Sequence, residues 1–123
     1  MALMGAELLF YPTAIGAEPQ DATLDTRHMW RRAMVGHAVS NCMPVIAANR
    51  VGAETDHGGD PQNFYGTSFI ANEWGDIVCD LNDSETGLMV ASFDLDQAAL
   101  HRASMGFFRD RRPQLYGRLV EDI

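Results

Sequence analysis

The sequence predicts an α/β fold with a mixed sheet, and three observations support this prediction. Short apolar runs at residues 8–11 and 44–49 have the length and composition of buried strands. Between them, residues 25–41 carry apolar side chains at helical spacing. Farther along, the runs at 67–71 and 76–79 flank a four-residue turn in the pattern of a β-hairpin. The strand–helix–strand order predicts a parallel pair with both sheet faces covered.

Length and composition predict one globular domain. The chain has 123 residues, of which 46% are hydrophobic and 21% charged. Its net charge of −8 argues against nucleic-acid binding and favours small cationic ligands. No run approaches the roughly 18 consecutive apolar residues needed to span a bilayer. A secretory signal begins with a basic segment, and the first arginine of this chain is Arg27, so we expect no such signal. We expect a cytoplasmic protein with reduced cysteines.

The first residues have the pattern of the end of a helix. Residues 1–4 favour a helix and Gly5 suits its C-cap, but four residues are too few to nucleate one. We therefore expect the earlier turns of this helix to lie outside the chain. The strand at 8–11, apolar on both faces, should end at Pro12, and a loop of small residues with one acid, Glu18, follows.

The predicted helix begins with a cap at Asp25 and ends near Asn41. Its apolar stripe consists of Trp30, Ala33, Met34, His37 and Ala38. The arginines that lie away from this stripe are Arg27, Arg31 and Arg32. We expect His37 to be a hydrogen-bonded core residue and not a catalytic base.

Beyond the second strand, residues 52–63 are rich in Gly and acidic residues and are expected to form an exposed loop. After the hairpin, residues 88–93 have the composition of another strand. Asp94 or Asp96 can cap a helix that ends near residue 104, and Pro113 is expected to open a last short helix.

The residues do not form a complete catalytic group. Cys42 and Cys79 lie in apolar segments, so each is expected to be a buried structural thiol. The sequence "GTSFI" at 66–70 lacks the second glycine of a nucleophile elbow. The histidines are not at metal-binding spacings, and we expect His57 to lie in a solvated loop without a cation. Phosphate-loop and dinucleotide motifs do not occur. We therefore expect no cofactor, no metal and no catalytic residue in this chain.

Six stretches together resemble the nitrilase superfamily of carbon–nitrogen hydrolases. In chain order they are "GAELLFYPTAIGAEPQD", "WRRAMVGHAVSN", "VIAANRVG", "FYGTSFIANEWGDIV", "FDLDQAALHRAS" and "FFRDRRPQLY". The ordered set spans nearly all of residues 1–123 and resembles only the C-terminal part of that superfamily's domain. The resemblance implies an α-β-β-α sandwich, of which residues 1–123 would be the C-terminal segment.

The resemblance is strongest to members that hydrolyse N-carbamoylputrescine to putrescine, ammonia and carbon dioxide. It implies a Glu-Lys-Cys triad in which Glu is the base, Lys stabilises the oxyanion and Cys forms a thiol acyl-enzyme. In the family all three precede the segment that resembles this chain, and neither Cys42 nor Cys79 corresponds to the nucleophile. The resemblance therefore implies an amidase as the intact protein and no activity in this chain alone.

The loop after the first strand is the part of the implied site that this chain contains. Ligands of α/β sheets collect beyond the C-terminal ends of the strands, where this loop is expected. The resemblance places Ala14, Ile15 and Glu18 in the substrate pocket, with Glu18 facing the distal ammonium group. A carboxylate pairs well with an alkylammonium ion in a partly dry pocket. The alternative is that Glu18 is a solvated loop acid.

Two other functions stay open. A β-ureidopropionase-like amidase would bind a substrate that ends in a carboxylate, for which an Arg would be expected in place of Glu18. The non-catalytic alternative is a truncated product that acts only by pairing with an intact protomer. Arg and aromatic residues in the tail at 107–116 are typical of interfaces, so we expect a homo-oligomer or pairing with an N-terminal half.

Overall fold

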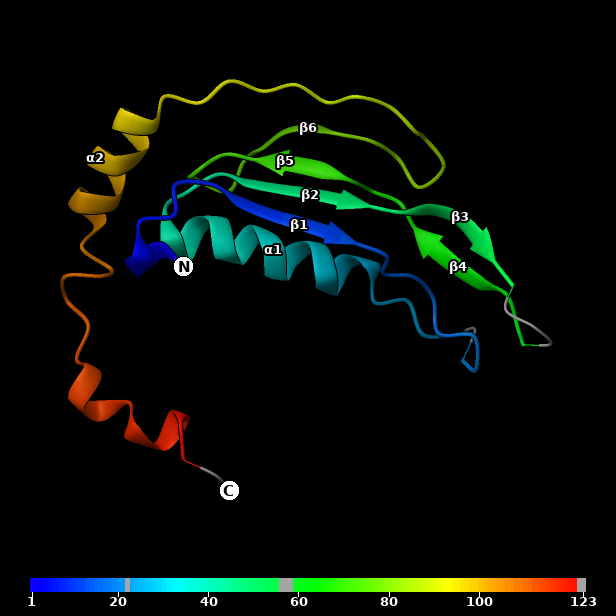
Figure 1. Ribbon diagram of the computed structural model, residues 1–123, viewed down its shortest axis with the longest axis horizontal. Coiled ribbons are helices and arrows are strands. Elements are labelled where there is room, and N and C mark those ends of the chain that lie inside the picture. Colours follow the sequence, from blue (N-terminus) through cyan, green and yellow to red (C-terminus); the bar gives the residue numbers. More distant parts are fainter. Residues whose placement is uncertain (22, 56–58, 122–123) are drawn as a thin grey trace.

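The computed structural model describes all residues except 22, 56–58 and 122–123 (Figure 1). One four-stranded sheet has the order β1-β2-β5-β6, and a separate two-stranded sheet joins β3 to β4. The strands are β1 (Leu9–Thr13), β2 (Val45–Asn49), β3 (Val51–Glu54), β4 (Gln62–Tyr65), β5 (Phe69–Ala71) and β6 (Ile77–Asp80). The α-helices are α1 (Arg27–Asn41) and α2 (Leu95–Met105), and three short 3-10 helices span Ala2–Met4, Pro113–Leu115 and Gly117–Leu119.

The predicted mixed sheet is confirmed. Strands β1 and β2 are parallel and are connected through α1, whereas β5 pairs antiparallel with both β2 and β6. The predicted β5–β6 hairpin is therefore present. The register places Leu9 beside Val45 and Thr13 beside Asn49, so β1 and β2 end at the same edge of the sheet.

The hydrophobic core lies between the sheet and α1. From α1, Trp30 and Ala38 are buried. They pack with sheet residues Leu9, Val45, Ala47, Phe69 and Ala71. The edge of the Trp30 ring meets the Phe69 ring at a centroid distance of 6.0 Å, a favourable geometry for two aromatic rings.

The opposite face of the sheet is only partly covered, so the prediction that both faces would be covered is wrong for the described residues. Phe10 is 66% exposed, and Ala48 and Pro12 are exposed beside it. In the described part of the chain, no second helix lies along this face (Figure 1). The prediction that β1 is apolar and buried on both sides is wrong for the same reason.

Two details of β1 and α1 differ from the prediction. Pro12 lies inside β1 and does not end it, because β1 is an edge strand where a missing N–H costs no ladder hydrogen bond. Thr26, not Asp25, is the N-cap of α1, while the carboxylate of Asp25 accepts a hydrogen bond from the Arg27 N–H at 2.9 Å. The helix ends at Asn41, as predicted.

The buried stripe of α1 is narrower than predicted. Ala33 and His37 are exposed, so the prediction that His37 belongs to the core is wrong. His37 is nevertheless hydrogen-bonded, since its Nδ1 lies 2.8 Å from the Tyr11 hydroxyl. One of the arginines off the stripe packs against the four-stranded sheet: Arg31 lies over the Phe69 ring and pairs with Asp80.

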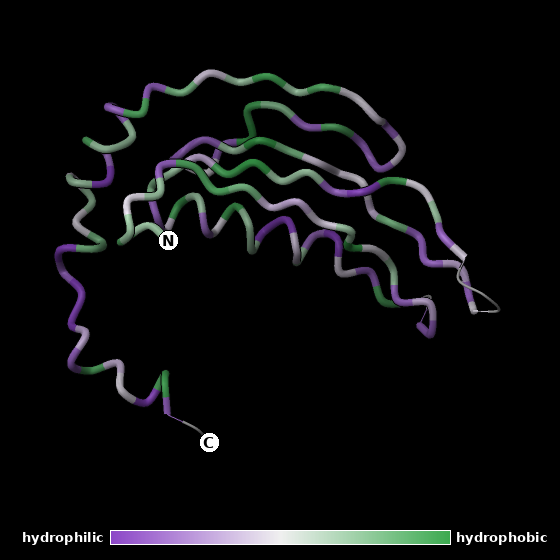
Figure 2. The backbone as a smooth tube through the Cα atoms, viewed as in Figure 1, coloured by the Kyte–Doolittle hydropathy of each residue, from purple (hydrophilic) through white to green (hydrophobic). Residues whose placement is uncertain are grey.

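In the second half, the predicted loop at 52–63 is wrong in part, because β3 and β4 pair along four residues each. The predicted strand at 88–93 is absent. This segment is extended, with Leu88, Val90 and Ser92 exposed and the residues between them partly buried, and no backbone hydrogen bond joins it to other described residues. Figure 2 shows that hydrophobic residues occur along it as they do along the strands.

The remaining elements agree with the prediction. Asp94 caps α2 by accepting a hydrogen bond from the Gln97 N–H at 3.0 Å. Pro113 is the first residue of a 3-10 helix, and Gly5 ends the N-terminal one in a left-handed conformation. No helix among the described residues combines the length and apolar character that crossing a membrane would require.

Candidate functional site

The loop after β1 lies where the sequence predicts the substrate site. Because β1 and β2 are parallel and in register, their C-terminal ends meet at one edge of the sheet, and residues 14–18 follow directly. Ile15 is half-buried and packs against the core. Ala14 and Glu18 are exposed. The three predicted site residues therefore share one loop, in which Ile15 packs against the core while part of its surface stays exposed, and Glu18 is exposed.

A buried asparagine at the end of β2 holds this loop from the inside. Oδ1 of Asn49 accepts hydrogen bonds from the Thr13 hydroxyl and the Ile15 N–H, each at 2.9 Å. Its Nδ2 donates to the backbone carbonyls of Ile15 and Gly66, each at 3.0 Å. The asparagine thus binds both backbone polar groups of Ile15. Sequence reasoning missed Asn49, although an amide at the C-terminal end of a parallel strand is a signal that could have identified it.

Strand β4 holds the loop from the outside. An isolated antiparallel bridge joins Gly16 to Phe64. The Ala17 N–H donates to the Asn63 carbonyl at 2.8 Å, and the Tyr65 N–H donates to the Ile15 carbonyl at 3.1 Å. Nε2 of Gln62 adds a hydrogen bond to the Ala17 carbonyl. The loop is therefore fixed between two segments distant in sequence.

Replacing Gly16 with Ala should break this arrangement. A Cβ at Gly16 would overlap the backbone carbonyl oxygen of Asn63, and backbone atoms cannot move aside as a flexible side chain can. We expect Gly16→Ala to lower the free energy of unfolding by about 1–3 kcal/mol, measured by urea denaturation.

Gly36→Ala is the matched control for this change. Gly36 lies in α1, and a Cβ there meets no atom within 4 Å. The control should be neutral or stabilising by up to about 1 kcal/mol, since Ala favours helices over Gly. A Gly16→Ala protein as stable as the control would contradict the close contact with β4.

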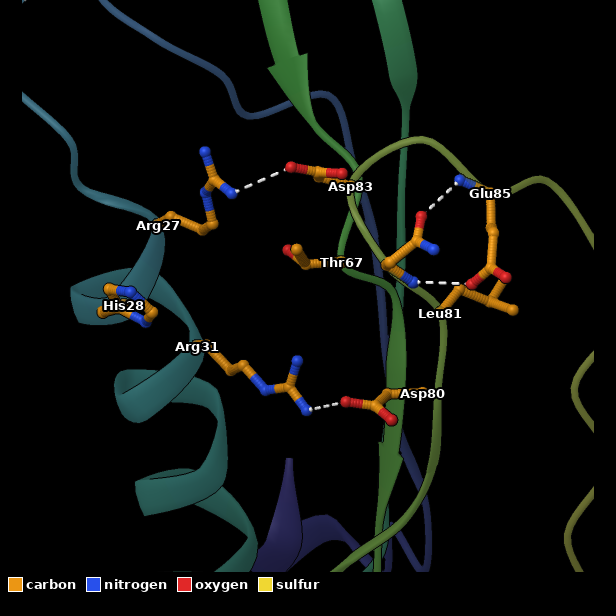
Figure 3. Close-up of a pocket in the computed structure, with 9 residues that line it drawn as sticks. Arg27, His28, Arg31, Thr67, Asp80, Leu81, Asp83 and Glu85 are labelled. Atoms are coloured by element: carbon orange, nitrogen blue, oxygen red, sulfur yellow. Dashed lines mark hydrogen bonds and ion pairs between the residues drawn. The ribbon is translucent and has the colours of Figure 1, made fainter.

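A charged groove lies beside β6, the edge strand on the side of the sheet away from β1 (Figure 3). It has a volume of about 470 Å³ and lies between α1 and the residues that follow β6. Arg27 and Arg31 point across it toward Asp83 and Asp80, and the Arg27–Asp83 ion pair measures 3.3 Å. Because each arginine already has a carboxylate partner, the groove is an ion-pair layer between α1 and β6 more than an anion site.

One residue in this groove is strained. Thr67 has a φ of 54°, a left-handed conformation that costs free energy for a β-branched residue. In the described part of the chain its buried hydroxyl has no hydrogen-bond partner, nor has Nε of Arg27.

The cysteines do not form a nucleophilic site. Cys42 is 1% exposed at the C-terminal end of α1, and burial raises the pKa of its thiol, which disfavours the reactive thiolate. Cys79 is only partly buried, so the prediction of a buried thiol is wrong there. Among the described residues, no group of three or more His, Cys, Asp or Glu side chains could hold a metal ion. His57 lies outside the described residues.

Comparison with known proteins supplies the family. The model of the carbon–nitrogen hydrolase family matches residues 1–103. The chain belongs to the carbon–nitrogen hydrolase family. It is similar over 98% of its length to the crystal structure of a carbon–nitrogen hydrolase from Helicobacter pylori, with a TM-score of 0.86 and 36% identity, and covers 43% of that chain. The predicted nitrilase-type fold is thereby confirmed for this part of the domain.

Several curated relatives of this carbon–nitrogen hydrolase chain are known. It is 56% identical to the N-carbamoylputrescine amidase of Arabidopsis thaliana and 54% identical to that of Solanum tuberosum, in each case over 94% of this chain. It is 42% identical to the citrullinase of Francisella tularensis over 98% of this chain. The chain spans about 40% of the length of these relatives.

Proposed function

We propose that this chain is the C-terminal segment of a carbon–nitrogen hydrolase that cleaves N-carbamoylputrescine to putrescine, ammonia and carbon dioxide. The observation that carries the proposal is the identity of 53–56% to four N-carbamoylputrescine amidases, against 42% to the citrullinase. In the intact protein, the family's thiol acyl-enzyme route would perform the reaction with groups outside this segment.

The segment contributes the part of the pocket that binds the non-reacting end of the substrate. Glu18 places a carboxylate at the end of a loop whose inner residue, Ile15, packs on the apolar core. An alkyl chain with a terminal ammonium group fits an apolar wall followed by a carboxylate. A substrate that ends in a carboxylate, as a β-ureidopropionase substrate does, would meet repulsion from Glu18.

The test uses the longer protein that contains this segment. Ammonia release is measured with N-carbamoylputrescine, citrulline and N-carbamoyl-β-alanine. We expect kcat/KM for N-carbamoylputrescine to exceed that for the other two by about tenfold or more, because loss of one charged pairing is worth about 1.5–3 kcal/mol. A preference for N-carbamoyl-β-alanine would refute the proposal, and a preference for citrulline would transfer it to the citrullinase class.

Glu18→Gln in this longer protein should raise the KM for N-carbamoylputrescine by about 10- to 100-fold and change kcat much less. Glu18 would bind the non-reacting end, so its contribution is nearly equal in the ground state and the transition state. The range follows from about 1.5–3 kcal/mol for a hydrogen bond to a charged group. Steady-state kinetics at saturating and limiting substrate separate the two constants.

Glu7→Gln is the matched control. Glu7 is also exposed, but it precedes β1 and therefore lies at the opposite end of that strand from Glu18. The control should leave both constants within about twofold, as expected for a surface substitution away from a site. An unchanged KM in Glu18→Gln would instead make Glu18 a solvated loop acid.

A further inference from the structure

We propose that Asn49 is a positioning residue that sets the substrate loop, residues 14–18, at the distance and angle needed for Ile15 and Glu18 to bind substrate; the inference rests on the proposed function. Asn49 itself is 8% exposed and its side chain spends all four hydrogen bonds on protein groups, so its role is not a contact with the substrate. Its role would be exerted through the backbone of the loop.

The hydrogen bonds of Asn49 explain why an amide stands at this place. Oδ1 accepts two hydrogen bonds and Nδ2 donates two, which uses the full capacity of the side chain. Asn49 lies on the same sheet face as Val45 and Ala47, where an apolar residue could equally be buried. Such a residue would leave the backbone groups of Ile15 and the carbonyl of Gly66 without these partners. The amide therefore stabilises the loop through hydrogen bonds that an apolar residue at this position of the sheet could not make.

The hydrogen bonds at Ile15 explain how Asn49 can fix the position of Glu18. The Asn49 side chain accepts a hydrogen bond from the Ile15 N–H and donates one to the Ile15 carbonyl. These are the two hydrogen bonds that a residue of a neighbouring strand would make with Ile15. Glu18 follows three residues later, across the bridge between Gly16 and Phe64. A shift of Ile15 would therefore carry Glu18 with it or break the bridge. Positions of groups that bind substrate must hold within fractions of an ångström to be effective.

Ser68 provides a matched control, because it bonds to the same asparagine on its other side. The Asn49 N–H donates to the Ser68 hydroxyl at 2.9 Å, and that hydroxyl donates to the Asn49 carbonyl at 3.2 Å. Ser68 is also buried, and none of its described hydrogen bonds reaches the loop. Ser68→Ala thus removes two hydrogen bonds to the backbone of Asn49 and leaves the bonds of its side chain to Ile15 in place.

The experiment compares Asn49→Ala with Ser68→Ala in the longer protein. For Asn49→Ala we expect amide hydrogen exchange of residues 14–18 to accelerate about tenfold or more, since the Ile15 N–H loses its acceptor. We expect the KM for N-carbamoylputrescine to rise about tenfold with a much smaller change in kcat. Ser68→Ala should leave both readouts within about twofold of the parent protein.

A milder pair of variants covers the case in which Asn49→Ala does not fold. Thr13→Val keeps the shape of the side chain but removes its hydroxyl donor to Oδ1, whereas Thr13→Ser keeps the donor. We expect a KM about threefold higher for Thr13→Val, in keeping with the loss of one neutral hydrogen bond, and a parental KM for Thr13→Ser.

The outcomes separate this inference from the proposed function. Unchanged exchange of residues 14–18 in Asn49→Ala would overturn the inference whatever the kinetics show. Faster exchange with an unchanged KM would also overturn it, because the loop would then not govern substrate binding. The Glu18→Gln variant tests the contact between Glu18 and substrate by itself. An unchanged KM in that variant would refute this contact, whereas hydrogen exchange of residues 14–18 would still test whether Asn49 positions the loop.

Discussion

The 123-residue chain alone is expected to release no ammonia from N-carbamoylputrescine above background. The family resemblance implies a Glu-Lys-Cys triad, and the nine basic residues of this chain are all arginines, so it has no lysine to offer. Of the two thiols, Cys42 is buried and its pKa is raised by that burial. Loss of even one member of a catalytic triad lowers kcat by roughly four orders of magnitude or more. The assay is steady-state ammonia release at millimolar substrate.

Two controls make this result decisive. The longer protein at the same molar concentration should be active under the same conditions. Cys42→Ser and Cys79→Ser in the 123-residue chain should both give the same background as the unmodified chain. Steady ammonia release that either substitution abolishes would show that the chain carries its own nucleophile, and the proposed division between this segment and the rest of the protein would be wrong.

Local patterns in the sequence were enough to predict most helices and the parallel pair. The end of α1 at Asn41, the Asp94 cap of α2 and the β5–β6 hairpin each depend on residues within one short segment. The pairing of β3 with β4 was missed because Gly and acidic residues favour a loop locally, while the pairing partner lies about ten residues away.

The site was predictable only in outline. Its location after β1 follows from the parallel order of β1 and β2, which a sequence can indicate. The network around Asn49 could not be predicted, since its partners Ile15 and Gly66 are 34 and 17 residues away in the chain. The exposure of His37 was missed for a related reason. Helical spacing shows which residues share one face of α1, but not how much of that face the sheet buries.

The segment at 88–93 has the composition of a strand but no neighbouring strand among the described residues. Its composition predicts a strand, but a strand requires a neighbour for its N–H and carbonyl groups. Leu88 is 88% exposed and Val90 is 77% exposed. With Phe10 at 66% on the open face of the sheet, these residues leave apolar surface in water at two places. Soluble monomers rarely expose contiguous apolar patches beyond a few hundred Å².

We therefore expect the 123-residue chain to be associated in solution, either with copies of itself or, in the longer protein, with the rest of the domain. Sedimentation velocity at low micromolar concentration should give a mass above the 13.6 kDa of one chain. Replacing Leu88 and Val90 with Ser should lower the associated fraction, because burial of each side chain is worth roughly 1.5–3 kcal/mol. Replacing the exposed polar residues Ser84 and Thr86 with Ala is the matched control and should not lower it. A cooperatively folded, strictly monomeric species would show instead that these residues complete their own core, since no other chain would then be needed to cover Phe10, Leu88 and Val90.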